Sequence, residues 1–286
     1  MIYILISILC SVTVGVLFKF ARRYKIDIPQ TISWNYLTAI ILCVLFFKIN
    51  LNQIRIPSSP IYIYLGVLLP VIFVLLAKSI KEIGIAKTDI AQRLSLFIPV
   101  IASYYLFSEH FSAIKILALL FGFAAIVLIL LKPAKKSKTG TLLFPLSVFV
   151  GYGIVDVLFK KVALMPDMAY PTSLLIVFIL AFVISAFYIG YFMLVQKSKL
   201  QVVNLICGCI LGIFNFANIY FYLKAHKALS TTPSLVFASM NLGVIVLGTL
   251  IGVYVFKEKL SPLNKLGIVL ALLAIITLTI SQVYGF

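Results

Sequence analysis

The sequence predicts an all-α integral membrane protein whose chain crosses the membrane ten times as a helix. Two observations support this fold class. First, 63% of the 286 residues are hydrophobic and only 11% are charged, whereas a soluble domain of this length needs far more polar surface. Second, apolar runs of about 18 residues or more recur along the whole chain, and a helix of that length crosses the roughly 30 Å hydrocarbon core of a bilayer.

Lys, Arg, Pro and Asn residues punctuate the apolar runs and set the ends of the expected helices. The ten expected helices span residues 2–19, 31–48, 60–80, 88–107, 113–131, 142–160, 171–195, 202–223, 232–256 and 263–282. The first run has no basic segment before it and no small-residue cleavage site. We therefore expect it to remain as a helix rather than to be removed as a signal peptide.

The basic residues lie mainly in the short joins between the apolar runs and give the chain a formal net charge of +17. In such joins they set the orientation and contact anionic lipid headgroups, so nucleic acid is not expected as a partner. Of the 24 Lys and Arg residues, 16 lie in the odd-numbered joins, which include the linker 132–140, and 7 lie in the even-numbered joins. The positive-inside rule therefore predicts a cytoplasmic linker and both termini outside, in a bacterial cytoplasmic (inner) membrane.

A short charged stretch occurs twice, each time between two apolar runs: LFSEHFSAIK at 106–115 and VFKEKLSPLN at 255–264. Aligning Glu109 with Glu258 also pairs the serines that follow three residues later. Upstream, the segment VLFKFA pairs with VLFKKV, and the landmarks keep their order along the chain. The order of these landmarks indicates an internal repeat.

The repeat has a consequence for the architecture, because each unit would cross the membrane five times, which is an odd number. Two such units in tandem enter the membrane in opposite orientations. We expect one unit at 1–131, the basic linker at 132–140 and the second unit at 141–286. Inverted repeats of this kind are typical of secondary transporters with a binding site near the middle of the membrane.

The first unit ends in GIAKTDIAQRLSLFIPVIASYYLFSEHFSAIKILALLFGFAAIVLIL, which has a small-residue helix start, Pro99 inside a helix, a Glu-basic-apolar-Ser turn and a last helix with glycine. The second unit ends in KALSTTPSLVFASMNLGVIVLGTLIGVYVFKEKLSPLNKLGIVLALLAIITLTIS, where Gly243 and Gly248 replace the proline. Together these stretches resemble the EamA-type repeat of the drug/metabolite transporter superfamily. The resemblance implies a ten-helix transporter of small molecules with both termini in the cytoplasm, opposite to what the charges predict.

Two ionisable residues stand out well inside expected spans, where such groups are costly and are therefore candidates for function. Arg93 lies in the fourth span, four residues after Asp89 on the same face. It either pairs with Asp89 or faces a cavity and binds a substrate carboxylate or phosphate through its planar fork. Asp156 shares a helix face with Tyr152 and Lys160. It is a candidate proton carrier or counter-ion for Arg93, unless it pairs with Lys160.

Other polar residues inside the spans form faces that would line a cavity for a polar solute or hydrogen-bond between helices. One such face on the eighth span holds Asn215, Asn218 and Tyr222. The expected substrate-binding residues are Arg93, Gln92, Asn35, Tyr152, Asn215, Asn218 and Asn241. Gly248 and Gly252 are expected to allow close helix packing.

Glu109 and Glu258 lie where a span is expected to end, each with a basic neighbour and a serine three residues later. This pattern favours a turn in which the carboxylate caps backbone N–H groups or the N-terminus of the following helix. A gating ion pair is the alternative.

These features favour a secondary transporter that moves a small polar or amphipathic metabolite by alternating access, driven by the substrate's own gradient, by an exchanged solute or by a proton through Asp156. A flippase for a lipid or a lipid-linked sugar is the alternative. An enzyme is disfavoured, because His110 and His226 lie at span ends and the four cysteines lack the partners of a metal site. We expect no metal and no cofactor, and a monomer or homodimer in contact with membrane lipids.

Overall fold

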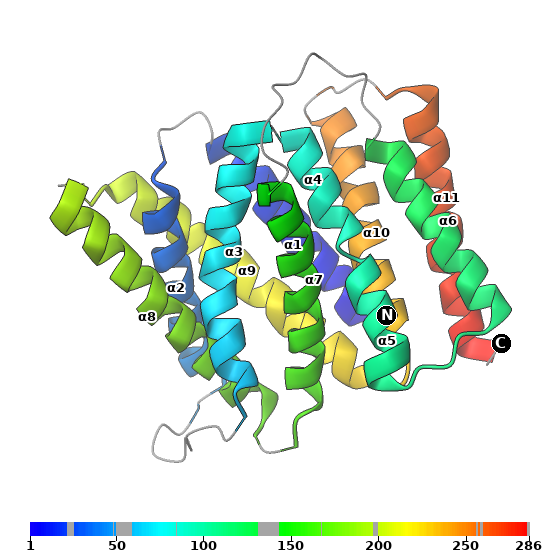
Figure 1. Cartoon of the computed structure of the whole chain (residues 1–286), viewed down its shortest axis with the longest axis horizontal. Helices are drawn as coiled ribbons and strands as arrows, with labels where there is room; N and C mark the ends of the chain where they lie inside the picture. The colour runs from blue at the N-terminus through cyan, green and yellow to red at the C-terminus, as the bar shows by residue number, and fades with distance from the viewer. Residues whose placement is uncertain are drawn as a thin grey trace.

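The computed structural model describes residues 1–21, 26–47, 49, 59–83, 85–130, 143–166, 168–196, 200–255, 257 and 260–284. These residues form eleven α-helices and no β-strand, which confirms the all-α class (Figure 1). The helices are α1 (Ile2–Ala21), α2 (Ile28–Phe47), α3 (Ile61–Ile83), α4 (Ile85–Leu94), α5 (Phe97–Phe107), α6 (Ala113–Leu130), α7 (Leu143–Leu164), α8 (Tyr170–Gln196), α9 (Val202–Ala228), α10 (Pro233–Tyr254) and α11 (Pro262–Tyr284).

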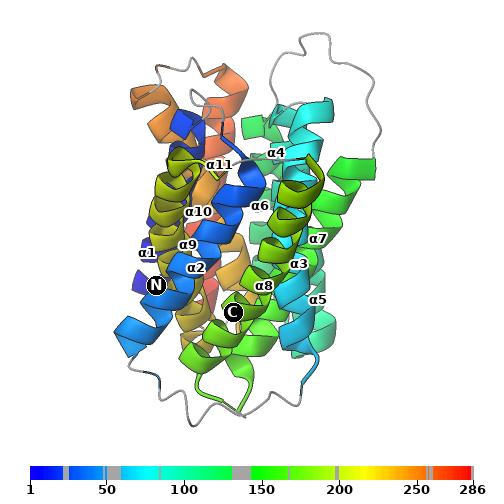
Figure 2. The ribbon, with the colours of Figure 1, turned by 90° about the vertical axis from the view of Figure 1, so that its left-hand side faces the viewer.

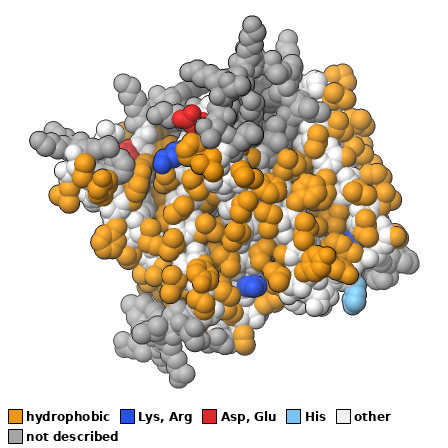
Figure 3. Space-filling view, viewed as in Figure 1, with side chains coloured by type: hydrophobic (Ala, Val, Ile, Leu, Met, Phe, Trp, Pro, Cys, Tyr) orange, Lys and Arg blue, Asp and Glu red, His pale blue; other side chains and the backbone are white. Residues whose placement is uncertain are grey.

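Most of the helices are long and apolar enough to cross a bilayer. Seven of those described meet this condition in full, and α1 and α6 contain shorter apolar segments. Many large apolar side chains are exposed, and they are spread across the face shown in Figure 3. Such a surface is unfavourable in water, whereas lipid tails solvate it. The chain is therefore an integral membrane protein.

The fourth expected span, 88–107, is not one continuous helix. The structure divides it into α4 and α5, with a turn at Ser95 and Leu96 between them. Pro99 explains the break, because it has no N–H to donate to the Ser95 carbonyl and its ring would clash there. That carbonyl instead accepts the N–H of Ile98 at 3.0 Å, in a tighter turn.

Two other spans continue by about one helical turn beyond their expected ends. The helix α7 reaches Leu164 rather than ending at residue 160, and α9 reaches Ala228 rather than ending at residue 223. A lysine normally indicates that a helix has left the membrane, but Lys160 is fully buried inside the protein. The sequence rule therefore placed the end of α7 one turn too early.

The helices pack into one bundle in which neighbours are often far apart in the sequence (Figure 2). The helix α2 packs against α8 and α9, α3 against α7 and α8, and α1 against α9 and α10. In addition, α7 packs against α4 and α5, and α6 packs against α11. Tyr36 of α2 and Phe178 of α8 are fully buried, with ring centroids 6.4 Å apart. Most of the packing thus joins the first five expected spans to the last five.

Glycine lets α9 approach α2 closely. A Cβ atom on Gly212 would lie 2.6 Å from the Thr38 Cβ and 2.7 Å from the Asn35 carbonyl oxygen. Gly208, one turn earlier, is equally close to the backbone of α2, so the two glycines form a small-residue pair of the kind that brings membrane helices together. Gly248 was also expected to allow close helix packing, but a Cβ atom added there would have no neighbouring atom within 4 Å.

Gly212→Ala should destabilise the contact between α2 and α9, because the added methyl group overlaps atoms of α2. We expect a loss of about 1–3 kcal/mol, measured as a fall in the melting temperature of the protein in detergent. Gly190→Ala on α8 is the matched control, because nothing lies within 4 Å of that position and alanine favours a helix over glycine by about 1 kcal/mol. Equal melting temperatures for the two variants would contradict this packing.

Candidate functional site

The break between α4 and α5 places Arg93 in the last turn of α4. Its side chain is half-buried, and the guanidinium acts electrostatically on the Asp156 carboxyl of α7. A cation at the C-terminal end of a helix is also favoured by the helix dipole. Gln92 precedes Arg93, and its backbone carbonyl accepts the Ser95 hydroxyl at 2.6 Å. The side chain of Asp89, the expected local partner of Arg93, lies outside the described residues.

Asp156 of α7 bonds to α9 and lies within electrostatic range of Arg93 of α4. Its Oδ1 accepts a hydrogen bond from the Tyr222 hydroxyl of α9 at 3.0 Å, and Tyr222 is itself buried. We call Arg93, Asp156 and Tyr222 the central polar cluster. Because its members come from α4, α7 and α9, a movement of any of these helices changes the environment of the Asp156 carboxyl.

A second polar contact lies where α2 meets α9. The Asn215 side chain donates to the Asn35 Oδ1 at 3.2 Å. Both asparagines line a small cavity, together with Val14, Ile32, Phe73 and Leu211. The free volume of this cavity is about 10 Å³, which is close to the space that one water molecule needs. In this conformation the cavity is too small for a metabolite.

The other expected binding residues are not among those that line this cavity. Asn218 accepts a hydroxyl hydrogen bond from α1 at 2.7 Å. Asn241 donates to the Phe237 carbonyl of its own helix at 3.1 Å. Tyr152 of α7 lies within electrostatic range of Tyr36 of α2. Asn218 therefore holds helices together, and Asn241 bonds within α10.

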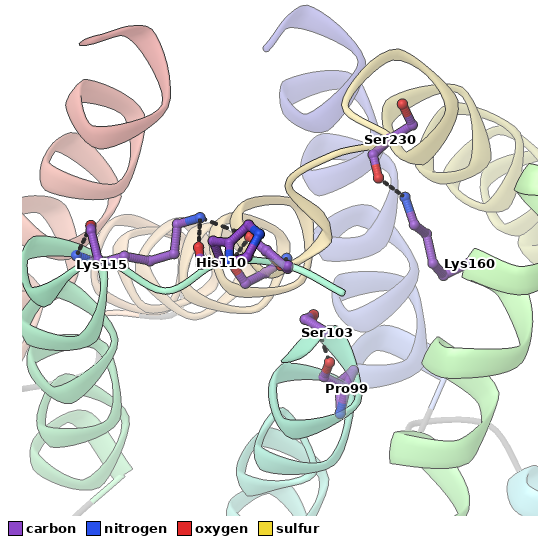
Figure 4. Close-up of polar contacts among 9 residues, drawn as sticks. Pro99, Ser103, His110, Lys115, Lys160 and Ser230 are labelled. Atoms are coloured by element: carbon purple, nitrogen blue, oxygen red, sulfur yellow. Dashed lines mark hydrogen bonds and ion pairs between the residues drawn. The ribbon is translucent and has the colours of Figure 1, made fainter. Parts of the chain in front are cut away.

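Glu109 has the most extensive set of polar contacts near the end of α5. Its Oε2 accepts the Ser234 backbone N–H at 2.9 Å, and its Oε1 accepts the Ser234 hydroxyl at 2.6 Å. The Lys115 ammonium donates to the same Oε1 at 2.9 Å and to the His110 carbonyl at 3.2 Å (Figure 4). Glu109 is 3% exposed. The carboxylate is thus buried and uses both of its oxygens.

The helix that Glu109 caps is α10, which is distant in the sequence, and not the following helix α6. The first turn of α6 is capped by the Ser112 hydroxyl, which accepts the Lys115 N–H at 3.2 Å. Glu258, the expected counterpart of Glu109, lies outside the described residues.

Lys160 has a role that the sequence pattern did not reveal. Its ammonium donates to the carbonyls of His226 at 3.2 Å and Ser230 at 3.0 Å, as Figure 4 shows for Ser230. The His226 carbonyl lies in the last turn of α9, where the last backbone groups of a helix need donors from elsewhere, and the Ser230 carbonyl lies in the turn just after it. Lys160 therefore binds the end of α9 instead of forming the ion pair with Asp156 that the sequence left open.

The sequence predicted only that His226 lies at the end of a span, and it did not predict that the side chain is buried. Its ring is fully buried, with its centroid 4.6 Å from the ring centroids of Tyr222 and Phe237. One signal was present in the sequence, because His226 follows Tyr222 by four residues and so continues the polar face of α9. For Lys160 no such signal existed, since its partners are backbone carbonyls.

Comparison with known proteins agrees with this arrangement. Residues 1–131 match the model of the EamA-like transporter family. An uncharacterized protein of Haemophilus influenzae (strain ATCC 51907 / DSM 11121 / KW20 / Rd) is 40% identical over 285 residues, which cover 96% of each chain. A protein crystal structure is similar over 97% of this chain and 98% of its own, with a TM-score of 0.71 and 17% identity. That last likeness is one of fold alone.

Lys160→Met should lower the stability of the fold, because it leaves the carbonyls at the end of α9 without a donor. We expect a loss of about 1–3 kcal/mol, measured as a lower melting temperature in detergent. Lys161→Met is the matched control, because the neighbouring lysine is only half-buried. If both variants melt at the same temperature, Lys160 does not stabilise the end of α9.

Proposed function

The chain belongs to the EamA-like transporter family of membrane transporters, and we propose that it is a secondary transporter that moves a small polar or amphipathic metabolite by alternating access. The observation that carries this proposal is the central polar cluster. Arg93 and Asp156 lie within the membrane-spanning bundle, where ionisable residues are costly and serve transport more often than stability.

Arg93 is the residue that binds the substrate. Its planar fork donates two parallel hydrogen bonds to a carboxylate or a phosphate, so the metabolite carries one of these groups. The ionised Asp156 carboxylate acts on the same guanidinium and therefore competes with a substrate anion. Protonation of Asp156 removes the competing charge and favours substrate binding. In this way Asp156 couples substrate binding to the uptake of a proton.

Substrate binding requires the helices to move. The cavity beside Asn35 and Asn215 holds about one water molecule, so a metabolite enters only when α2 and α9 separate from their neighbours. The break between α4 and α5 supplies a point at which the fourth span can bend beside Arg93. Interrupted helices of this kind are common at the binding sites of transporters.

The movement follows from two inverted repeats, residues 1–131 and 141–286, joined by the basic linker 132–140, which lies outside the described residues. The packing supports this division. The proposed repeats make α1 the counterpart of α7, α2 of α8, α3 of α9, α4 and α5 of α10, and α6 of α11. The contact of α2 with α9 should then recur as a contact of α8 with α3, and the contact of α1 with α9 as one of α7 with α3. All four contacts occur. Likewise, the contact of α1 with α10 recurs as contacts of α7 with α4 and α5. The contact of α6 with α11 joins two counterparts and is therefore its own equivalent. A bundle with this symmetry can open to either side in equivalent ways.

Untargeted metabolite profiling of cells that express the wild type, Arg93→Ala or no protein should identify the substrate. We expect a few small carboxylated or phosphorylated metabolites to change in the wild-type cells alone. In proteoliposomes loaded with such a metabolite, Arg93→Ala should slow its release about 10- to 100-fold, which corresponds to a charged hydrogen bond of about 1.5–3 kcal/mol.

Two further variants sharpen this test. Arg93→Lys keeps the charge without the fork, so its rate should lie between those of the wild type and Arg93→Ala. Asp156→Asn should still exchange the metabolite but should no longer respond to an imposed pH gradient. Identical metabolite profiles for all cells would contradict the proposed function, and a melting shift with polyprenyl-phosphate lipids but with no soluble solute would indicate a flippase.

The charge pattern supports a cytoplasmic linker and both termini outside, in a bacterial cytoplasmic membrane. In a cysteine-free background, Lys136→Cys should react with a membrane-impermeant maleimide in inverted vesicles and not in intact cells. His110→Cys lies in a join of the opposite parity and should show the reverse pattern. Labelling of Lys136→Cys in intact cells would overturn this orientation.

A further inference from the structure

The turn between α9 and α10 is held at both ends by buried charges that come from other segments. Figure 4 shows the bond of Lys160 to Ser230 at the end of the turn next to α9. Lys160 binds carbonyls at the C-terminal end of α9, and Glu109 binds the N-terminal end of α10 through Ser234. Each charge has the sign that the adjacent helix end favours, since a helix is partly negative at its C-terminus and partly positive at its N-terminus. The turn is therefore fixed by a cation on one side and an anion on the other.

The two charges tie the turn to different parts of the chain. Lys160 lies on α7, which belongs to the same proposed repeat as α9 and α10. Glu109 lies in the segment between α5 and α6, which belongs to the other repeat. When one repeat moves against the other, the bonds of Lys160 can stay intact, whereas the two bonds between Glu109 and Ser234 must break.

Lys115 makes such a break possible without leaving an isolated buried charge. It lies in α6, in the same repeat as Glu109, and its ammonium is 2.9 Å from the Glu109 Oε1. Removing all partners from a buried carboxylate is strongly unfavourable, but this ion pair travels with Glu109. The bonds to Ser234 are therefore the part of the cluster that can open and close.

We propose that Glu109 and Ser234 form a latch that closes the substrate path at the face where α5 ends and α10 begins, with Lys115 neutralising Glu109 while the latch is open. This inference rests on the proposed function. The side chains of Glu109 and Lys115 are 1% and 7% exposed, so the latch is closed in this structure. Under the orientation proposed above, the latch closes the outer face.

Cysteine labelling tests the latch without a substrate. In a variant that lacks the native cysteines, Ser103→Cys places a reporter in the last turn of α5, where Ser103 is fully buried and its carbonyl accepts the Glu109 N–H at 3.0 Å. With the protein in nanodiscs, Glu109→Gln should increase the maleimide labelling rate of this reporter several-fold. Ser234→Ala removes one bond of the latch and should give a smaller increase.

Two controls separate an open latch from a loosened fold. Ser79→Cys is a second reporter, because Ser79 is fully buried and its hydroxyl bonds to that of Thr88, in the same proposed repeat, at 2.7 Å; its labelling rate should stay unchanged. His110→Gln is the matched variant, because His110 is exposed and contributes only its backbone carbonyl; it should leave both reporters unchanged. Equal acceleration of both reporters by Glu109→Gln, or acceleration of neither, would overturn the latch.

The same measurement distinguishes the latch from the proposed function. Labelling depends only on whether the face opens, whereas metabolite release from proteoliposomes depends on transport. If the Ser103→Cys reporter responds as expected but the protein releases no metabolite, the proposed function is contradicted. The latch between Glu109 and Ser234 would still be supported.

Discussion

Hydrocarbon offers no hydrogen-bond partner, and this constraint decides where the polar side chains of the protein lie. Several buried polar groups find their partners on distant parts of the chain. The Tyr62 hydroxyl of α3 pairs with the Ser173 hydroxyl of α8 at 3.0 Å. The Lys160 ammonium takes the carbonyls at the end of α9, and Asp156 takes the Tyr222 hydroxyl. Polar contacts therefore join helices that are distant in the sequence, and they fix the arrangement that apolar packing alone leaves open.

These contacts are of two kinds. Some lie within one proposed repeat, such as the bonds of Lys160, and they keep that repeat rigid as a body. Others cross between the repeats, including the contact of Glu109 with Ser234 and the action of Arg93 on Asp156. A transporter needs both, since a rigid body can rock only if the contacts at its boundary exchange one set of partners for another. The crossing contacts include the candidate binding residues as well as the proposed latch.

Hydropathy alone was enough to predict the all-α class and nearly all the spans, because the bilayer selects for apolar length. The break in the fourth span was less visible: Pro99 was noted in the sequence, but its effect depends on how the freed Ser95 carbonyl is satisfied. The partners of Glu109 and Lys160 could not be predicted, because Ser234 and the His226 carbonyl are brought there by the tertiary fold. Arg93 and Asp156 could be predicted as candidates for function from the sequence, because a charge inside an apolar run stands out without any tertiary information.

Alternating access to Arg93 is the central claim, and the accessibility of its neighbour Gln92 tests it most directly. Gln92→Cys in a cysteine-free chain can be exposed to a membrane-impermeant maleimide in intact cells and, separately, in inverted vesicles. If the site opens to each side in turn, the reagent labels this cysteine in both preparations, and Arg93→Ala leaves the labelling in place. Labelling in only one preparation, or in neither, would contradict alternating access at this site.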